Sequence, residues 1–500
     1  MTRRPRPSRQ TGVPQPPFAQ VPRLYPPVEV LVADQIEAIH HAALTVLRDT
    51  GMRVLDATAR QLYADAGAQV TEDRVRFDPA MISERLLTIP LAFSLTARNP
   101  ARNLHFGGNH CVFASVGGPA YVMDAENGRR DGSLAEMQNY LRLVQSLNVI
   151  HQEGGGPFEP MDLPAPTRHL DIYLAQITLL DKSWQTQTLG HARTMDGLEM
   201  AALMQAVPID HLPTTLLGII NTNSPLQLDV PMAEGLIAMA RHNQVNVITP
   251  FTLSGAMAPI TIAGALTLQH AEAMAGLVLT QIVRPGAPAM YGGFTSNVDM
   301  RSGSPAFGTP EYTKAAQASG QLARHIRVPF RSSNVTASNA VDAQAAYESQ
   351  MSLWGAIMGG AHLIEHAAGW MHGGLTASFE KLILDAENLA MMQSYLEPIR
   401  TDPDSLATEA IAAVGPGGHF FGASHTMSRF QDAFYTPLVS NWDNYPQWLQ
   451  KGGQDATQRA TAVWKSLLAD HQDPGIDPGI QESLQDYVTR RKAEGGAPMN

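Results

Sequence analysis

One short segment carries several side chains suited to binding a metal ion or a cationic ligand. Residues 361–378 read AHLIEHAAGWMHGGLTAS, and His362, Glu365 and His366 form an H-x-x-E-H string of the kind used by one class of zinc peptidase. Two such histidines bind one zinc ion from a helix, where residues i and i+4 share a face. In a strand the same two histidines lie roughly 13 Å apart, too far for a single ion.

Glycines around this string favour a strand over a helix. They precede and follow it at Gly359, Gly360, Gly369, Gly373 and Gly374. We therefore expect no directly bound metal and no peptidase activity, and we interpret His362 as an internal histidine with satisfied hydrogen bonds. Glu365 and His366 then lie at the end of a strand, where we predict that they are the catalytic residues.

Amide, aromatic, carboxylate and histidine side chains near the ends of other apolar runs extend this candidate site. The predicted substrate-binding residues are Tyr291, Phe294, Trp370, His372, Gln187, Asn221, Phe251, Asn334, His151 and Glu153. Aromatic faces from several elements form the usual cage for a quaternary ammonium group, although core packing is the alternative for each aromatic residue. No lysine lies at these positions, which argues against a Schiff-base mechanism. Arg331 is the only arginine expected at a strand end.

The elements that must position these residues recur along the middle of the chain. Eight short apolar runs start about 30 to 45 residues apart, which leaves room for a strand, a loop and a crossover helix. They are residues 111–115, 148–152, 184–188, 215–221, 245–249, 288–293, 329–335 and 362–366. Eight such units predict an α/β fold with a closed (β/α)₈ TIM-type barrel, whose chemistry sits at the carboxyl ends of the strands. An open doubly wound sheet is the alternative, but no G-x-G-x-x-G turn follows any run.

The flanking regions differ in composition from the barrel region, residues 111–400. Residues 1–27 contain eight prolines and four early arginines, which predicts a disordered tail. A helical pattern over residues 32–50 opens an N-terminal α+β extension, residues 28–110. Residues 401–500 predict a C-terminal helical cap. Its Gly-rich stretch GPGGHFFGASHT, residues 415–426, is either an ordinary loop, a lid or a source of metal-binding histidines.

The composition restricts the class of protein. The 500 residues carry a net charge of −11, which gives no support for nucleic-acid binding. Cys111 is the only cysteine, so no intrachain disulfide forms, and a reducing cytoplasm is the expected compartment. The arginines near the N-terminus have no apolar stretch behind them, so we expect no signal peptide, and we expect no membrane-spanning segment.

Several longer motifs, taken together and in order, resemble the trimethylamine methyltransferase family. They are GGPAYVMDAENGRRDG (117–132), YGGFTSNVDMRSGSPAFGTPE (291–311), VDAQAAYES (341–349), GLTASFEKLILD (374–385) and GPGGHFFGASHT (415–426). Archaeal members that use trimethylamine carry pyrrolysine near the segment that corresponds to residues 341–349, whereas this chain has only standard residues there. It therefore resembles the non-pyrrolysine branch, whose characterised members demethylate quaternary amines such as glycine betaine.

The resemblance implies a (β/α)₈ barrel and transfer of a methyl group from a quaternary amine to the Co(I) of a separate corrinoid protein. The cobalamin would be carried by that partner, because no histidine here belongs to the D-x-H-x-x-G string of cobalt-binding domains. We expect a small quaternary amine substrate, a corrinoid protein partner and a homo-oligomer. The alternatives are a zinc-dependent corrinoid methyltransferase acting on another methyl donor and a non-catalytic betaine-binding module. Glycine betaine, proline betaine and carnitine present the same cation.

Overall fold

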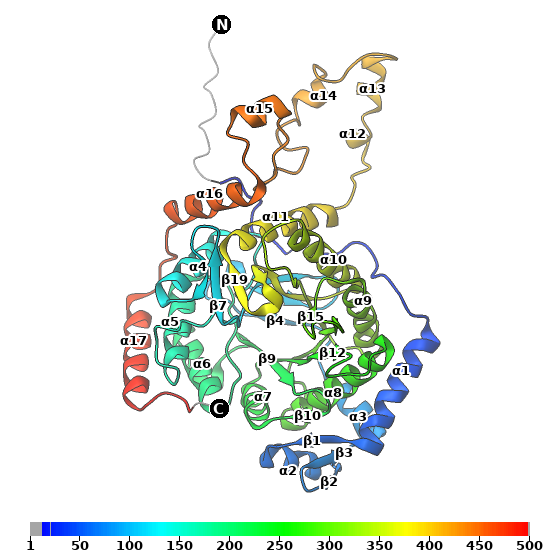
Figure 1. Cartoon of the computed structure of the whole chain (residues 1–500), viewed down its shortest axis with the longest axis vertical. Helices are drawn as coiled ribbons and strands as arrows, with labels where there is room; N and C mark the ends of the chain where they lie inside the picture. The colour runs from blue at the N-terminus through cyan, green and yellow to red at the C-terminus, as the bar shows by residue number, and fades with distance from the viewer. Residues whose placement is uncertain (1–12, 21, 499–500) are drawn as a thin grey trace.

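Parallel strands curl into a barrel at the centre of the molecule (Figure 1). The computed structural model describes residues 13–20 and 22–498. Six strands run in the order β6-β17-β16-β13-β11-β9. Their bounds are Val112–Ser115 (β6), Leu217–Thr222 (β9), Val245–Pro250 (β11), Ala289–Gly292 (β13), Phe330–Ser333 (β16) and Leu363–Ala368 (β17).

Single parallel bridges close the barrel between β6 and β9. Ala114 pairs with Gln152, Gln152 with Ser183, and Gln185 with Leu217. The predicted runs 148–152 and 184–188 thus supply the two remaining positions in the wall as extended chain. All eight predicted positions contribute to one closed barrel, which confirms the predicted fold class.

A helix follows each position in the wall. In chain order they are α4 (Leu134–Ser146), α5 (Arg168–Leu179), α6 (His191–Met204), α7 (Val230–Arg241), α8 (Ile262–Val283), α9 (Pro310–His325), α10 (Ala343–Gly359) and α11 (Phe379–Leu396). Local sequence sets their ends. The Asp342 carboxylate accepts hydrogen bonds from the backbone N–H groups of Gln344 and Ala345 in the first turn of α10. Gly360 ends that helix in the left-handed conformation, with φ 89°.

Alternation along the strands divides the apolar side chains between two cores. One set fills the inside of the barrel, including Val247, Met290 and Leu363. The hairpin of β4 (Phe93–Leu95) and β5 (Leu104–Phe106) packs on this set and covers the amino ends of the strands.

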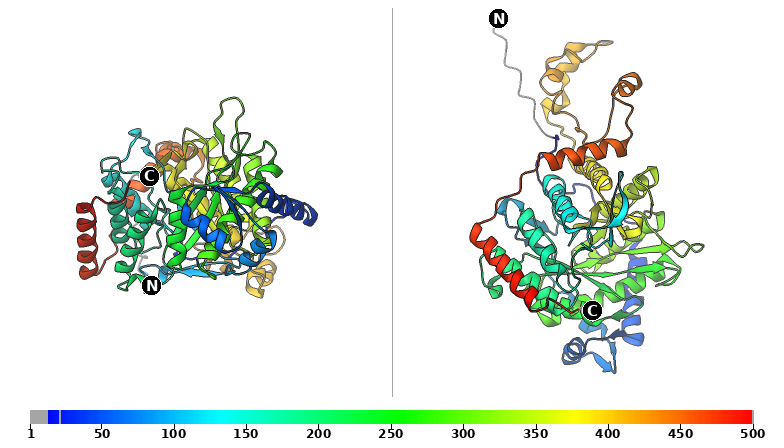
Figure 2. Two further views of the ribbon diagram at one scale, coloured as in Figure 1. Left: turned by 90° about the horizontal axis from the view of Figure 1, so that it is seen from below. Right: turned by 60° about the vertical axis from the view of Figure 1, so that its left-hand side comes forward.

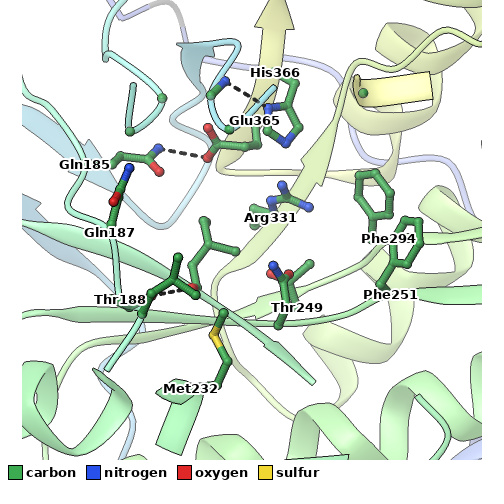
Figure 3. A pocket seen from close by; sticks show the side chains of 18 of the residues that line it. Gln185, Gln187, Thr188, Met232, Thr249, Phe251, Phe294, Arg331, Glu365 and His366 are labelled. Carbon is green, nitrogen blue, oxygen red and sulfur yellow. Dashed lines mark hydrogen bonds between the residues drawn. The ribbon is translucent and has the colours of Figure 1, made fainter. Parts of the chain in front are cut away.

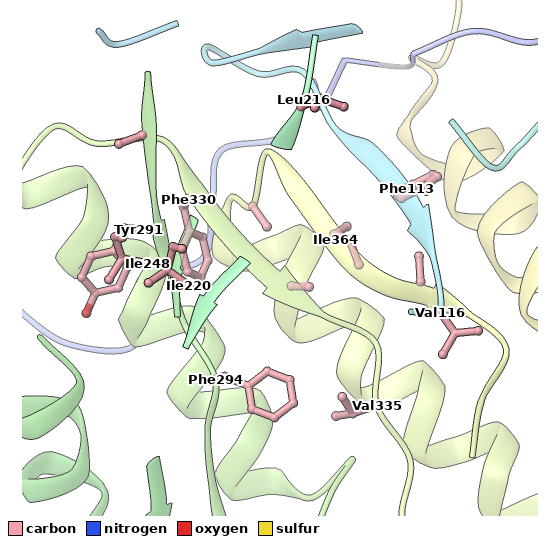
Figure 4. Close-up of a cluster of buried hydrophobic side chains, with 14 of the residues drawn as sticks. Phe113, Val116, Leu216, Ile220, Ile248, Tyr291, Phe294, Phe330, Val335 and Ile364 are labelled. Atoms are coloured by element: carbon pink, nitrogen blue, oxygen red, sulfur yellow. The ribbon is translucent and has the colours of Figure 1, made fainter. Parts of the chain in front are cut away.

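The intervening strand residues face the surrounding helices. Phe113, Ile248, Tyr291, Phe330 and Ile364 belong to this outer core, which is shown in Figure 4. Because successive strand residues point to opposite faces, a shift of one position decides whether a side chain reaches the inside of the barrel.

Short strands extend the carboxyl ends of the barrel. One sheet has the order β18-β19-β7-β8 and a second has the order β12-β14-β15, and β10 pairs with the N-terminal strand β1. The bounds are Tyr121–Asp124 (β7), Gly128–Asp131 (β8), Gln227–Leu228 (β10), Thr252–Ser254 (β12), Thr295–Val298 (β14), Pro305–Ala306 (β15), Trp370–Met371 (β18) and Thr376–Ser378 (β19).

The N-terminal extension is α+β, as predicted, and packs over α8. Helix α1 (Ala33–Thr45) continues as the π-helix η1 (Val46–Thr50), and Gly51 follows with φ 74°. The other elements are β1 (Met52–Val54), α2 (Ala57–Asp65), β2 (Gln69–Thr71), β3 (Arg74–Arg76) and α3 (Pro79–Leu86). Helices α1, α2 and α3 all contact α8.

This covering explains the apolar composition of α8. The helix is long and apolar enough to cross a membrane by length and composition, contrary to the expectation that no segment of the chain would be. However, 78% of its most apolar window is buried, against the barrel on one side and the extension on the other. Because α8 is buried on both sides, apolar residues occur on all of its faces.

The expected disordered tail lies partly outside the described residues, at positions 1–12 and 21. For the rest of the tail the prediction is wrong, because these residues pack against the base of the barrel. The Ala19 carbonyl accepts hydrogen bonds from His151 and Gln393, and Arg23 is buried with a hydrogen bond to the Ala361 carbonyl. Proline-rich composition predicted disorder, but tertiary contacts hold this segment in an extended conformation.

The residues after α11 are helical, as predicted. Helix α16 (Ala456–Ala469) packs on α11 and α4, and α17 (Pro478–Ala493) packs on α5 and α6, so both lie along the outside of the barrel. Four short helices project away from it (Figures 1 and 2). These are α12 (Pro403–Leu406), α13 (Thr408–Val414), α14 (Ser424–Met427) and α15 (Tyr445–Gln450).

Candidate functional site

A cavity of about 640 Å³ opens at the carboxyl ends of the barrel strands, where a barrel of this type places its chemistry. Of the residues predicted from the sequence, it brings together Gln187, Asn221, Phe251, Phe294, Glu365, His366 and Trp370. They come from successive strands and from the loops that follow them. Figure 3 shows polar side chains on one side of the cavity and aromatic rings on the other.

Glu365, in the middle of β17, brings a buried carboxyl group to the cavity. Its Oε2 accepts a hydrogen bond of 2.9 Å from Gln185 Nε2, whereas its Oε1 has no hydrogen-bond partner among the described residues. Burial raises the pKa of Glu365 to about 7, although the nearby Arg331 and the bond from Gln185 act in the opposite direction. The group can therefore change its charge near neutral pH.

His366 reaches the same cavity through an irregularity in β17. Neighbouring residues of a regular strand point to opposite faces, so Glu365 and His366 would be separated. The pairing of β17 with β6 shifts register between Ile364 and Ala368, and His366 has a left-handed φ of 53°. This bulge directs both side chains into the cavity.

The hydrogen bonds of His366 define its protonation. Its Nδ1 accepts from the Gly117 backbone N–H at 3.4 Å, so Nε2 carries the ring proton. Burial, with the nearby Arg331, holds the pKa of His366 well below its ordinary value. A neutral imidazole thus offers an N–H donor.

Arg331, in β16, places a cationic group inside the barrel. The side chain is 2% exposed, and its Nε and Nη1 have no hydrogen-bond partner among the residues that the structure describes. Its guanidinium carbon lies 5.4 Å from the ring centroid of Phe294. Burial lowers the pKa of Arg331, and Glu365 opposes this effect. Buried guanidinium N–H groups without partners are a suitable site for a carboxylate ligand.

Aromatic rings form a second part of the cavity wall, next to Arg331. The centroids of Phe251 and Phe294 lie 5.2 Å apart, and those of Phe294 and Trp370 lie 6.3 Å apart. Trp370 also lies against His366, with 4.3 Å between the ring centroids. This wall has the composition of a site for a quaternary ammonium group.

Buried polar side chains of α8 and α11 hold the backbone that carries these aromatic rings. Gln269 of α8 accepts hydrogen bonds from the Phe294 backbone N–H at 3.1 Å and from Thr295 Oγ1 at 2.7 Å. Asp385 of α11 accepts from the backbone N–H of Gly369, immediately before Trp370, at 2.9 Å.

Two predicted site residues face the outside of the barrel instead of the cavity. The Tyr291 hydroxyl contacts Gln269 and His270 of α8. His151 stacks on Phe113 and accepts its backbone N–H. Both are separated by one position from inward-facing neighbours, so their assignment to the site was wrong.

Glu153 is also directed away from the cavity, although it supports part of the lining. Its carboxylate accepts from the N–H groups of Gly155 and Gly156 and from the Gln176 side chain. Burial raises the pKa of Glu153 to about 7, and Glu365 adds to this effect. We interpret Glu153 as a support for the glycine loop that lines the cavity at Gly154 and Gly155.

Asn334 and His372 also lie outside the lining, and local structure explains both. Asn334 follows β16, and its amide donates to the Ala367 carbonyl, which braces the bulge. His372 contacts Thr376 and the Asn339 carbonyl. Neither side chain lines the cavity.

Several lining residues were absent from the predicted set, including Arg331, Gln185, Thr249, Met232 and Met257. The first three could have been found by alternation. Arg331 is in register with Leu363, which faces inward, and the next inward position of β17 is Glu365. The methionines come from a helix and a loop, for which strand alternation provides no signal.

The H-x-x-E-H string is a strand, as predicted, so its histidines do not share a helical face. His362 accepts from the Phe330 backbone N–H and contacts the Gly108 carbonyl, which agrees with a satisfied internal histidine. Among the described residues, no group of three or more His, Cys, Asp or Glu side chains is arranged to hold a metal ion. The Gly-rich stretch 415–426 lies in the projecting segment and contributes nothing to the lining.

These features define a (β/α)₈ barrel enzyme with one buried site at the carboxyl ends of its strands. The chain belongs to the trimethylamine methyltransferase (MTTB) family, whose model matches residues 2–496. The predictions of this family and of a methyltransferase are therefore confirmed.

Known proteins similar to this chain agree with the assignment. A glycine betaine methyltransferase of Desulfitobacterium hafniense (strain Y51) is 34% identical over 476 residues, covering 95% of this chain and 99% of the relative. A trimethylamine methyltransferase MttB of Desulfitobacterium hafniense (strain DSM 10664 / DCB-2) is 26% identical and covers 93% of this chain and 94% of the relative. A crystal structure of MtmB with hydroxylamine superposes with a TM-score of 0.51 at 10% identity, covering 91% of this chain and 88% of that one, and shows the same fold.

Proposed function

We propose that this protein transfers a methyl group from a trimethylammonium compound that also carries a carboxylate, such as glycine betaine, to a reduced corrinoid on a separate protein. The observation that carries the proposal is Arg331, a buried guanidinium that lines the same cavity as the aromatic rings and has N–H groups without a partner among the described residues. The 34% identity to a glycine betaine methyltransferase over nearly the whole chain supports the same substrate class.

Each end of such a substrate has matching groups in the cavity. The guanidinium of Arg331 and the Nε2–H of His366 are donors for a carboxylate. Phe251, Phe294 and Trp370 supply aromatic faces for the trimethylammonium group, and Glu365 adds a negative charge above its pKa of about 7. Gln187 and Asn221 line the cavity as further amide donors.

The chain's contribution to the reaction is position and exclusion of water. A quaternary nitrogen leaves as a neutral amine, so the leaving group requires neither acid nor metal activation. The corrinoid, when its carrier protein is docked, supplies the acceptor for the methyl group. This chain must hold the substrate by both ends, so that one N-methyl carbon faces the opening of the cavity.

The proposal has four further parts. We propose a corrinoid protein partner, no directly bound metal, a cytoplasmic location and a homo-oligomeric state. We further propose that the chain has an N-terminal extension at residues 28–110, a barrel at residues 111–400 and a C-terminal cap at residues 401–500.

Calorimetry with two ligands of similar shape tests the role of Arg331. Glycine betaine carries a carboxylate, whereas choline carries a hydroxyl group in a similar place. Arg331→Gln should weaken glycine betaine binding by roughly 10- to 150-fold and change choline binding much less. Equal loss for both ligands, or none for either, contradicts the assignment of the carboxylate site.

Methyl transfer is measured separately, with reduced corrinoid protein as the acceptor. Demethylation of glycine betaine and much slower turnover of trimethylamine are the expected results. Saturable betaine binding without any methyl transfer identifies a binding module instead. Activity that requires one equivalent of zinc supports the zinc-dependent alternative.

A further inference from the structure

The segment between α11 and α16, residues 397–455, projects from the side of the barrel and is called the projecting arm below (Figures 1 and 2). Large apolar side chains are exposed along its whole length. Ile399 and Phe421 are 87% exposed, Phe434 is 85% exposed, and Trp442 is 69% exposed. Soluble monomers rarely expose apolar surface of this extent, which usually marks an interface.

Polar contacts attach one part of the arm to the barrel helices. Glu387 of α11 accepts hydrogen bonds from the backbone N–H groups of Val439 and Ser440 at 2.9 and 3.3 Å. Arg459 donates to the Val439 carbonyl at 2.8 Å. Val439 is the one buried residue within this described segment. The arm is therefore anchored near its C-terminal end, and its exposed apolar side chains do not fold back into the protein's own core.

The barrel itself carries a second exposed apolar surface beside the root of the arm. It is formed by α10 and α11, and it is called the apolar patch below; its residues are Tyr347, Met351, Met391 and Tyr395. Within each helix the two residues are four positions apart and so share one face. Gln350 of α10 donates to Asn388 of α11 at 2.8 Å and joins the two helices between these pairs.

We infer that the projecting arm packs on the apolar patch of a second copy of this chain, and that the exchange is reciprocal. One chain supplies both surfaces, and α11, which carries part of the patch, ends at Leu396 where the arm begins. A twofold axis near the end of α11 lets each arm cover the apolar patch of the other copy. The same contact is then made twice, as in a dimer with twofold symmetry.

The polarity of the arm favours a second copy over the corrinoid protein. An acceptor that must bind and leave in each turnover forms a transient interface, and transient interfaces are about as polar as the rest of the surface. Permanent interfaces between identical chains are more apolar. Phe421 and Phe434, each more than four-fifths exposed, match the permanent kind.

Sedimentation equilibrium of the full chain tests the inference. The wild-type protein should be a dimer or a larger assembly. Phe421→Asp combined with Phe434→Asp in the arm, or Met391→Asp in the patch, should weaken association by at least about tenfold. Leu87→Asp is the matched control, because Leu87 is 70% exposed but follows α3 in the N-terminal extension. Circular dichroism shows whether each variant keeps its helix content.

A cross-link locates the contact without depending on destabilising substitutions. A photoreactive phenylalanine analogue in place of Phe434 should join two copies, with α10 or α11 peptides of the second copy identified by mass spectrometry. A monomeric wild-type protein, an assembly that survives both the arm and the patch variants, or a cross-link to other surfaces overturns the inference. A cross-link that forms only when corrinoid protein is added also overturns the inference, because it assigns the arm to that partner.

Discussion

Arg331 and Glu365 introduce opposite charges into one cavity, and polar atoms of both lack a hydrogen-bond partner among the described residues. Each has polar atoms left for a ligand: Nε and Nη1 of Arg331, and Oε1 of Glu365. A zwitterionic molecule meets both requirements at once, because its carboxylate compensates the arginine and its cation compensates the glutamate. The site thus favours a ligand with no net charge over a simple cation or anion.

The raised pKa of Glu365 makes cation binding dependent on pH. Since burial raises this pKa to about 7, the carboxyl group is neutral at pH 5.5 and anionic at pH 8.5. Tetramethylammonium does not titrate, so its affinity should rise roughly tenfold between these values as the anion forms. Calorimetry across this range measures the effect.

Glu365→Gln should give a much flatter pH profile, since it keeps the shape of the side chain and removes the titrating group. Glu159→Gln is the control. Glu159 also lines the cavity, but it pairs with Arg168 at 3.2 Å. An unchanged profile in Glu365→Gln would assign the titration to another group.

Trp370 tests the aromatic wall. Trp370→Ala should weaken trimethylammonium binding by roughly 3- to 30-fold, and Trp370→Phe should have a smaller effect, because an aromatic face remains. Trp464→Ala is a suitable control, since this tryptophan packs on Phe379 between α16 and α11. Full affinity in a folded Trp370→Ala protein would show that the ring only packs.

At the scale of elements, the order and number of barrel positions followed from the sequence, but the direction of individual side chains did not. Recurring apolar runs indicate where strands lie, but they do not indicate which side chains point into the barrel. Tyr291 and His151 were assigned to the site from position alone, and the one-residue alternation sends both outward. The bulge that turns His366 inward depends on pairing with β6, more than 200 residues earlier, and has no local signal.

Gln269 links one element, α8, to the ligand site. Its amide makes four hydrogen bonds, including the one from the Phe294 backbone, and it is fully buried. Gln269→Leu leaves these partners unsatisfied, so it should cost about 1 to 3 kcal/mol of stability and also weaken trimethylammonium binding. Denaturant unfolding and calorimetry measure the two effects.

Gln281 provides the matched comparison for this variant. It is equally buried and belongs to the same helix, but it bonds Ala287 and Gly286 in the loop that precedes β13. Gln281→Leu should lower stability without reducing affinity. Similar affinity losses in both variants would mean that α8 acts on the site only through general stability.

At the scale of the molecule, the N-terminal segment fastens the end of the barrel opposite the cavity. Arg23 is buried, contacts the Ala361 carbonyl just before β17, and shares backbone and side-chain bonds with Asn109. Arg23→Met should lower the free energy of unfolding by about 1 to 3 kcal/mol and leave ligand affinity unchanged. A large affinity loss would show that the two ends of the barrel are coupled.

The barrel wall is held unevenly around its circumference. Between β6 and β9 it has single bridges at Gln152, Ser183 and Gln185, whereas β9 and β11 pair over six residues. Local opening therefore disrupts fewest hydrogen bonds along this seam, which also carries Gly154, Gly155 and Gln187 of the cavity. Backbone amides of the seam should exchange with deuterium faster than those of β11, and a bound ligand should slow them. This result would identify the seam as the compliant side of the barrel, through which substrate is admitted.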